Sequence, residues 1–182
     1  MPRPRKQLDF RAAAEALTEP GAERATMEAI ARRLAIAKPT LYRMAGSREE
    51  LIGVCVDAEA ERLLEQLHRG FGEPAAAPAE RLAAGLHAFF RFAEDSPAGF
   101  LLLFGGRYPE ARQAVRRVEN RLRDALQRET RRSRRSARHA ELLAAGLLGL
   151  AAAVARRAIE DGVALDAARL PSALGRALAE GF

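Results

Sequence analysis

The sequence predicts an all-α protein in which a small N-terminal unit precedes a larger C-terminal helical bundle. Apolar residues recur at intervals of three and four in nearly every segment, as expected of helices with one buried face. No segment alternates polar and apolar residues in the way that a half-buried strand would. Two glycines and two prolines interrupt the helical pattern between residues 70 and 78, so we expect one unit at 1–70 and another at 71–182.

Length and composition restrict the class of protein further. With 182 residues, the chain is too short for a large multidomain enzyme. No stretch approaches the roughly 18 consecutive apolar residues of a membrane span, and no signal-peptide core follows the basic N-terminus. Cys55 is the only cysteine, which excludes an internal disulfide and a cysteine-based zinc site. We therefore expect a cytoplasmic protein, and its formal net charge of +6 favours a polyanionic partner.

Three short helices and one long helix are expected before the break. The first covers residues 10–17, the second ends at Leu34, and the third begins near Lys38 with a proline in its first turn. The long helix runs from about residue 48 to residue 68. Its start is marked by Ser47–Glu50, a sequence typical of a capping box.

Five further helices are expected in the C-terminal unit. Leucine and phenylalanine stripes predict a helix that ends near Asp95, and Ser96-Pro97 opens a short helix with serine as its N-cap. A long helix follows Tyr108-Pro109. Two more are expected at about 137–161 and 172–180.

Residues 26–52 carry the clearest indication of function. A helix ending at Leu34, a turn at 35–37 and a second short helix form a helix-turn-helix, whose second helix enters the major groove of DNA. The exposed face of that helix offers hydroxyl and cationic groups suited to phosphates and base edges. These groups belong to Lys38, Thr40, Tyr42 and Arg43.

This segment resembles the tetracycline-repressor (TetR) family of bacterial transcription regulators. The resemblance covers about residues 8–67, and the order and spacing of the matching residues carry it. They are Thr26, Ile30-Ala31, Leu34, Ile36, Lys38-Pro39-Thr40-Leu41-Tyr42-Arg43 and Gly46-Ser47-Arg48-Glu49-Glu50-Leu51. The resemblance implies a DNA-binding domain at 1–70 and a helical domain for ligand binding and dimerisation at 71–182.

The resemblance also implies which residues meet double-stranded operator DNA. Thr26 and Tyr42 would contact backbone phosphates, while the residues from Lys38 to Thr40 would approach bases. Arg48 would meet a phosphate at the N-terminus of the long helix, where amide groups already favour an anion. The DNA-binding set is Thr26, Ala37, Lys38, Pro39, Thr40, Tyr42, Arg43 and Arg48.

Three alanines depart from the family pattern. Ala35 stands where glycine is usual, and it costs little free energy if its φ angle stays negative. Ala37 stands where serine is usual and removes a side-chain N-cap, an interaction worth roughly 1 kcal/mol. Ala45 replaces a large apolar side chain, so we expect Met44 or another neighbour to fill that space.

Aromatic side chains in the C-terminal unit offer a lining for a small apolar or aromatic effector. Five of the eight phenylalanines fall between residues 89 and 104. Aromatic residues at helical spacing fit an ordinary core equally well, so both interpretations stand. The candidate lining is Phe89, Phe90, Phe92, Phe100, Leu103, Phe104 and Tyr108.

The last two helices are candidates for a homodimer interface. A stripe on the helix at 137–161 is suited to close packing against a symmetry mate, although an intrachain core would show the same stripe. Its members are Leu143, Leu147, Leu150 and Val154. A two-fold dimer would place its reading helices one DNA turn, about 34–36 Å, apart and would require a near-palindromic site.

A basic run lies between Arg128 and Arg138, where six arginines accompany one acidic residue. Such a run is more often a solvated connection between helices than a second nucleic-acid patch or a site for anionic ligands. All three interpretations remain open for this segment.

These observations predict a homodimeric, sequence-specific transcriptional regulator, here a repressor that a small-molecule effector releases from its operator. One alternative is a nonspecific architectural DNA-binding protein that uses the arginine run, and another is a helical interaction module without DNA binding. Nothing indicates catalysis, because His68, His87 and His139 are scattered and no phosphate-binding loop appears. We therefore expect no enzyme, no cofactor and no metal.

Overall fold

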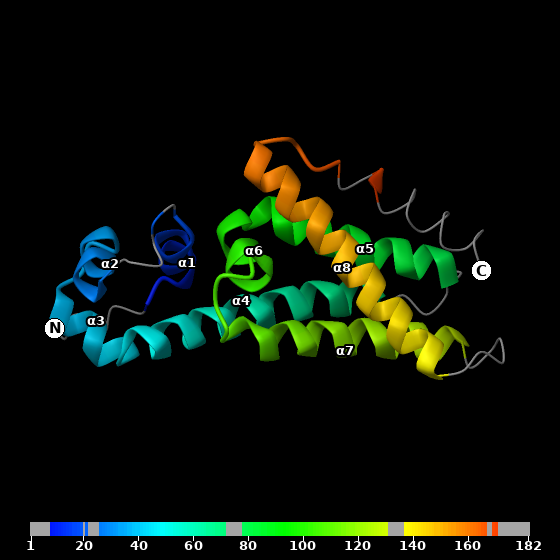
Figure 1. Cartoon of the computed structure of the whole chain (residues 1–182), viewed down its shortest axis with the longest axis horizontal. Helices are drawn as coiled ribbons and strands as arrows, with labels where there is room; N and C mark the ends of the chain where they lie inside the picture. Colours follow the sequence, from blue (N-terminus) through cyan, green and yellow to red (C-terminus); the bar gives the residue numbers. More distant parts are fainter. Residues whose placement is uncertain are drawn as a thin grey trace, which may run out of the picture.

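The described residues of the computed structural model form eight α-helices and no strand (Figure 1). The structure describes residues 8–19, 21, 26–71, 78–130, 137–166 and 169–170. The helices are α1 (Phe10–Thr18), α2 (Met27–Arg33), α3 (Lys38–Ala45), α4 (Arg48–Phe71), α5 (Pro78–Asp95), α6 (Pro97–Phe104), α7 (Ala111–Thr130) and α8 (Ala137–Asp161). The prediction of an all-α fold is confirmed.

Helices α1, α2 and α3 lie at one end of the molecule, and α4 extends from that end into the bundle formed by the later helices (Figure 1). The interior of this end is built from small and aliphatic side chains. They are Ala13, Ala14, Leu17, Ile30, Ala31 and Leu41, all buried. Small residues let the short helices approach closely, so three helices of nine, seven and eight residues share one core.

The start of α4 is fixed by the predicted capping box. The Glu50 amide donates to Ser47 Oγ at 3.1 Å, and the Ser47 amide donates to Glu50 Oε2 at 2.6 Å. These hydrogen bonds favour the carboxylate and lower the pKa of Glu50. Gly46 precedes the box with a φ of 67°, where a Cβ would also collide with the Glu50 carboxylate. A two-residue connection therefore ends α3 and starts α4.

The turn between α2 and α3 places Ala35 at a φ of 51°, in the left-handed region. The Ala35 amide donates to the Arg32 carbonyl at 3.2 Å, and the Ile36 amide donates to the Ala31 carbonyl at 3.0 Å. This pair of hydrogen bonds is the Schellman pattern, whose left-handed position is usually glycine. The sequence predicts a low free-energy cost for Ala35 only if its φ angle is negative, and the angle is positive. Ala35 therefore carries a cost of roughly 1–2 kcal/mol that glycine would avoid.

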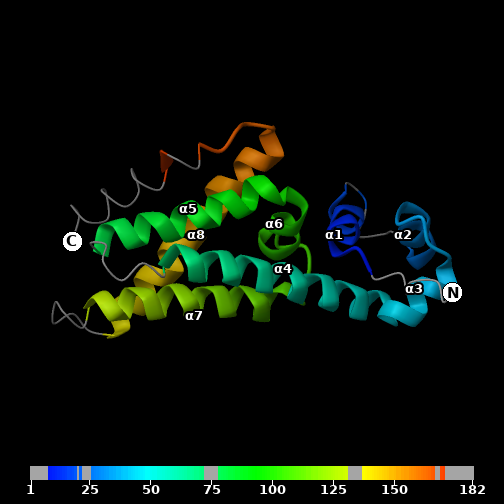
Figure 2. The same cartoon turned by 180° about the vertical axis from the view of Figure 1, so that it is seen from behind.

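The rest of the chain forms a bundle in which α4 packs against α5 and α7, and α7 packs against α8. In both views α7 runs beside α4, while the short α6 lies between α1 and the long helices (Figure 2). The core is rich in aromatic rings and leucines. Its largest fully buried side chains include Phe90, Phe92, Phe100, Leu63 and Leu102.

The C-terminal helix boundaries follow the predictions closely, with one correction. α5 ends at Asp95 and α8 covers Ala137–Asp161, as expected. Ser96 occupies the N-cap position of α6, but its side chain makes no capping hydrogen bond. It donates instead to Glu59 Oε2 at 3.4 Å, so the predicted N-cap position is confirmed but the side chain of Ser96 does not cap the helix. The helix expected at 172–180 lies outside the described residues.

Candidate nucleic-acid interface

Thr26 begins the helix-turn-helix and fixes the start of α2. Its Oγ1 accepts a hydrogen bond from the Ala29 amide at 3.2 Å, which makes it the N-cap. The residue is exposed, and a hydroxyl that accepts one hydrogen bond still has a proton to donate, for example to a phosphate. The sequence pattern predicted a phosphate contact for Thr26 but not its role as the N-cap of α2.

Helix α3 buries one narrow face and exposes the rest. Leu41 and Ala45, which are four residues apart and therefore share a face, are buried. The side chain of Tyr42 is 46% exposed, so it is available to a partner at this surface. The outward face of α3 consists of Lys38, Pro39, Tyr42 and Arg43, with Thr40 half-buried at its edge.

Positive charge gathers at this end of the molecule. Lys38 begins α3, Arg43 lies in its last turn, and the half-buried Arg48 begins α4. Lys38 Nζ lies 3.3 Å from Glu28 Oε2 in the first turn of α2. Arg33 pairs with Glu19, which directs its guanidinium toward the end of α1.

The N-terminus of α3 lacks a side-chain cap. Ala37 holds the N-cap position without any side-chain hydrogen bond, which confirms the predicted loss. Pro39 has no N–H group and suits the first turn. The partial positive charge of a helix N-terminus is therefore not offset by a capping oxygen, and an anion near it is favoured.

The structure brings the eight predicted DNA-binding residues to one end of the molecule. Six of them are exposed and two, Thr40 and Arg48, are half-buried. They come from the start of α2, from α3 and from the start of α4. A convex helix face bearing hydroxyl, ammonium and guanidinium groups can enter a groove of a polyanion and donate hydrogen bonds there.

The residues expected to line an effector pocket pack against one another. The Phe89 ring lies edge-on to Phe90, Phe100 and Phe104, with centroid distances of 5.9, 5.5 and 5.3 Å. Phe100 and Phe104 are 4.9 Å apart. All seven members of the set are buried except Phe104, which is partly buried. In this conformation the four phenylalanine rings named above pack against one another between α5 and α6.

A groove of about 550 Å³ lies elsewhere, between α4 and α7. It is lined by the aliphatic Leu64 and by five ionisable residues: Glu61, Glu65, His68, Arg69 and Arg121. Arg121 Nη2 lies 2.6 Å from His68 Nδ1 across it. None of these residues was predicted to bind a ligand, and the groove shares none with the aromatic set.

The predicted dimer stripe is divided between two faces of α8. Leu147 is buried against the bundle and Val154 is partly buried, whereas Leu150 is 49% exposed. Leu142, which sequence analysis did not single out, is 68% exposed on the same helix. The side chain of Leu143 lies outside the described residues, as do those of the basic run from Arg128 to Arg138.

Hydrogen bonds tie the end of α1 to the connection between α6 and α7. The buried Tyr108 hydroxyl donates to the Leu17 carbonyl at 2.5 Å. Arg107 Nη1 donates to the carbonyls of Thr18 and Glu19 at 3.2 and 3.1 Å. The last turn of α1 is thus anchored to the C-terminal bundle, which neither periodicity nor any motif predicted.

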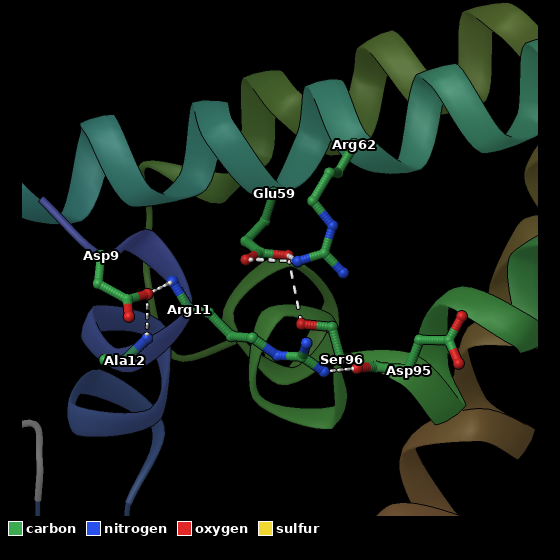
Figure 3. A network of polar contacts seen from close by, with 7 residues as sticks. All are labelled: Asp9, Arg11, Ala12, Glu59, Arg62, Asp95 and Ser96. Carbon is green, nitrogen blue, oxygen red and sulfur yellow. Dashed lines mark hydrogen bonds and ion pairs between the residues drawn. The ribbon is translucent and has the colours of Figure 1, made fainter. Parts of the chain in front are cut away.

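A buried carboxylate lies where α4 meets the start of α6 (Figure 3). Glu59 is 1% exposed and accepts hydrogen bonds from the Ser96 hydroxyl at 3.4 Å and from Arg62 Nη1 at 3.2 Å. Burial raises the pKa of Glu59, and the charge of Arg62, the Ser96 hydroxyl and Arg11 oppose that rise. Arg11 of α1 also donates to the Asp95 carbonyl. This network links α1 and α4 to the junction between α5 and α6.

Other reactive groups are inert or absent in the part of the chain that the structure describes. Cys55 is fully buried, and burial raises the pKa of its thiol to about 12, so the thiol stays protonated at neutral pH. No three His, Cys, Asp or Glu side chains with a described placement gather as a metal site. No described helix combines the length and the apolar character needed to cross a membrane.

Comparisons with known proteins match the helix-turn-helix segment and extend beyond it. Residues 10–55 match the family model described as bacterial regulatory proteins, tetR family. The chain is similar to the HTH-type transcriptional activator FasR of Mycolicibacterium smegmatis, with 28% identity over 149 residues, which are 80% of this chain and 68% of that protein.

Similarity to solved structures extends over the whole chain. A TetR-like transcriptional regulator from Rhodococcus sp. RHA1 is 28% identical, with a TM-score of 0.76 and full coverage of both chains. The fatty acid degradation regulator FadR from Bacillus halodurans has a TM-score of 0.80 over 95% of this chain and 97% of that one. At 15% identity, the second similarity supports the fold alone.

Proposed function

Because this chain belongs to the TetR family of bacterial regulatory proteins, we propose that it represses transcription from an operator and that a small apolar effector releases it. The observation that carries the proposal is the outward face of α3. There Lys38, Pro39, Tyr42 and Arg43 are exposed around the buried Leu41. The function is that of a cytoplasmic transcription factor and not of an enzyme.

In the proposed DNA recognition, some residues position the protein on the phosphate backbone and others contact the bases. Thr26, Tyr42 and Arg48 hold phosphates and set the register of α3 in the major groove. Lys38 and Thr40 then reach base edges, while Pro39 contacts them through its apolar ring. The exposure of the α3 face and the uncapped N-terminus of that helix support this assignment.

We also propose a homodimer in which residues 71–182 pair the two subunits and residues 1–70 bind DNA. The outward face of α8 supports it, because Leu142 and Leu150 are exposed beside the small residues Gly146 and Gly149. Leu147 and Val154 would then support that face from the bundle side. Two-fold pairing requires half-sites about 34–36 Å apart on the duplex.

The effector is proposed to enter beside the aromatic set on α5 and α6. Because those rings now pack together, binding requires some of them to turn aside. Tyr108 belongs to that set and also donates a hydrogen bond to the end of α1, so a displaced Tyr108 would weaken the attachment of α1 to the bundle. A coupling of about 1–3 kcal/mol would change operator affinity about 5- to 150-fold.

A second candidate function is activation, which the name of the similar protein FasR favours. Both functions use the same DNA-binding surface. Transcription in vitro from a promoter that carries the selected site distinguishes them, since a repressor lowers the transcript yield and an activator raises it.

The test of the DNA-binding proposal is selection of duplexes by the full-length protein from a random pool. Binding to the selected duplex and to a scrambled duplex is then titrated between 50 and 200 mM salt. A regulator should prefer the selected site by about 10³-fold or more. Equal affinity for both duplexes would support the architectural alternative, and no binding to either would support an interaction module.

A further inference from the structure

Glu28 places a negative charge within the cationic end of the DNA-facing surface. Its Oε2 lies 3.3 Å from Lys38 Nζ, and the two residues are ten positions apart, so the ion pair joins α2 to α3. The side chains of Lys38 and Glu28 are 51% and 73% exposed, which leaves the pair open to an incoming duplex. An ion pair this exposed contributes little to folding.

A carboxylate at this place opposes contacts between Lys38 and phosphate. Any phosphate that approaches the Lys38 ammonium also approaches Glu28, and like charges repel. If the ammonium turns to the phosphate, it gives up its partner and leaves the carboxylate facing a polyanion. Phosphates occur in every sequence, so this penalty falls on all DNA alike.

Lys38 can donate hydrogen bonds to base edges without that electrostatic penalty. The ammonium has three N–H donors, and the ion pair with Glu28 occupies one of them. The other two can be donated to adjacent acceptors on a base edge, such as guanine O6 and N7. Lys38 can therefore keep Glu28 as a partner while it reads a base in the floor of the groove.

We propose that Glu28 is a specificity-determining residue, which withholds Lys38 from phosphates and presents it to base edges. It weakens binding to unrelated DNA more than binding to the operator. This inference rests on the proposed function and adds to it a residue outside the predicted DNA-binding set. The ligand that fits the Lys38–Glu28 ion pair is a base edge with two adjacent hydrogen-bond acceptors in the major groove.

The experiment compares five full-length proteins: wild type, Glu28→Gln, Glu49→Gln, Lys38→Met and the Glu28→Gln/Lys38→Met double variant. Glu49 is the matched control, because it is an exposed acid in the first turn of α4 and its substitution changes the net charge equally. Affinities for the selected and the scrambled duplex are measured by fluorescence anisotropy between 50 and 200 mM salt. Thermal unfolding of each variant verifies that it is folded.

The released ammonium should gain a phosphate contact on scrambled DNA. Glu28→Gln should therefore bind the scrambled duplex about fivefold more tightly, with a salt slope steeper by about one. Its affinity for the selected duplex should change by less than about twofold, because base contacts depend little on phosphate charge. In the Lys38→Met background, the effect of Glu28→Gln should fall to that of Glu49→Gln.

Equal tightening on both duplexes would overturn the inference, and so would an effect that persists without Lys38. A Glu28→Gln variant that behaves like Glu49→Gln would also overturn it, because net charge alone would then account for the change. These failures leave the wild-type preference for the selected duplex intact. Loss of that preference in the wild type would instead refute the proposed function together with this inference.

Discussion

Two helices of eight residues, α3 and α6, put the same length of chain to opposite uses. α3 buries only Leu41 and Ala45, whereas α6 buries Gly99, Phe100, Leu102 and Leu103. α3 therefore contributes mainly exposed surface and is packed on neighbouring helices through two residues, whereas α6 is part of the core. Substitutions on α3 should change binding without unfolding the protein, and substitutions on α6 should do the reverse.

The largest effect on stability is expected at Phe100, whose ring is fully buried between Phe89 and Phe104. Phe100→Ala should lower the free energy of unfolding by about 3–5 kcal/mol, because it opens a cavity in a packed core. Urea denaturation followed by circular dichroism measures this change. Tyr42→Ala on α3 is the matched aromatic control and should cost no more than about 0.5 kcal/mol. Similar losses for both variants would remove the contrast between the two helices.

A smaller effect on the free energy of unfolding is expected where the end of α1 contacts the connection between α6 and α7. Tyr108→Phe keeps the buried ring and removes only the hydroxyl that donates to the Leu17 carbonyl. The variant should lose about 1–2 kcal/mol of unfolding free energy, typical of one buried hydrogen bond. Hydrogen exchange should also become faster at the end of α1. Unchanged exchange there would show that Tyr108 does not anchor α1.

An increase in stability is expected at the turn before α3. Ala35→Gly relieves the left-handed φ of 51°, and the gain exceeds the backbone entropy that glycine loses. The unfolding free energy should rise by about 0.5–1 kcal/mol. Ala84→Gly, at an exposed position inside α5, should instead lower it by about 1 kcal/mol. A loss at both positions would mean that Ala35 is not strained.

The smallest expected effect is a change in pH dependence. Since burial raises the pKa of Glu59, the native protein retains its proton above the ordinary value of 4.5, where the unfolded chain has released it. Stability from this group therefore falls as pH rises from 4.5 to the raised pKa. Glu59→Gln should remove that fall, measured by urea denaturation from pH 4.5 to 8.

Glu50 provides a contrast in sign, because its pKa is lowered. The contribution of Glu50 to the free energy of unfolding is complete above pH 4.5, and it is lost as the pH falls through the lowered pKa of this group. When the urea series is extended below pH 4.5, the loss of the Glu50 contribution should therefore appear in Glu59→Gln as it does in the wild type. An unchanged slope above pH 4.5 in that variant would mean that Glu59 does not titrate as described.

Local signals in the sequence predicted the helices and the exposed face of α3 well. The Ser47–Glu50 capping box and the period of the apolar residues act within a few residues, so they are visible in the sequence. Glu59 was missed, although it lies on the same stripe of α4 as Val56 and Leu63. A carboxylate on an apolar stripe is a signal that burial will require partners.

Features that depend on packing between distant segments could not be predicted. The hydrogen bond from Tyr108 to Leu17 joins residues that are 91 positions apart. Leu147 and Leu150 are three residues apart on α8, yet one is buried and the other is half-exposed. Periodicity places both on one broad face, and the packing of α8 against α5, α6 and α7 decides which of them is covered.

The most direct test of the central claim is the affinity of Lys38→Ala/Tyr42→Ala for the duplex that the wild type selects. Two lost contacts of about 1–3 kcal/mol each predict a loss of about 100-fold or more, with the unfolding midpoint unchanged. The control Arg112→Ala/Gln113→Ala, an exposed pair on α7, should bind the duplex as the wild type does. Wild-type affinity in the α3 variant would contradict the claim that this face of α3 binds DNA.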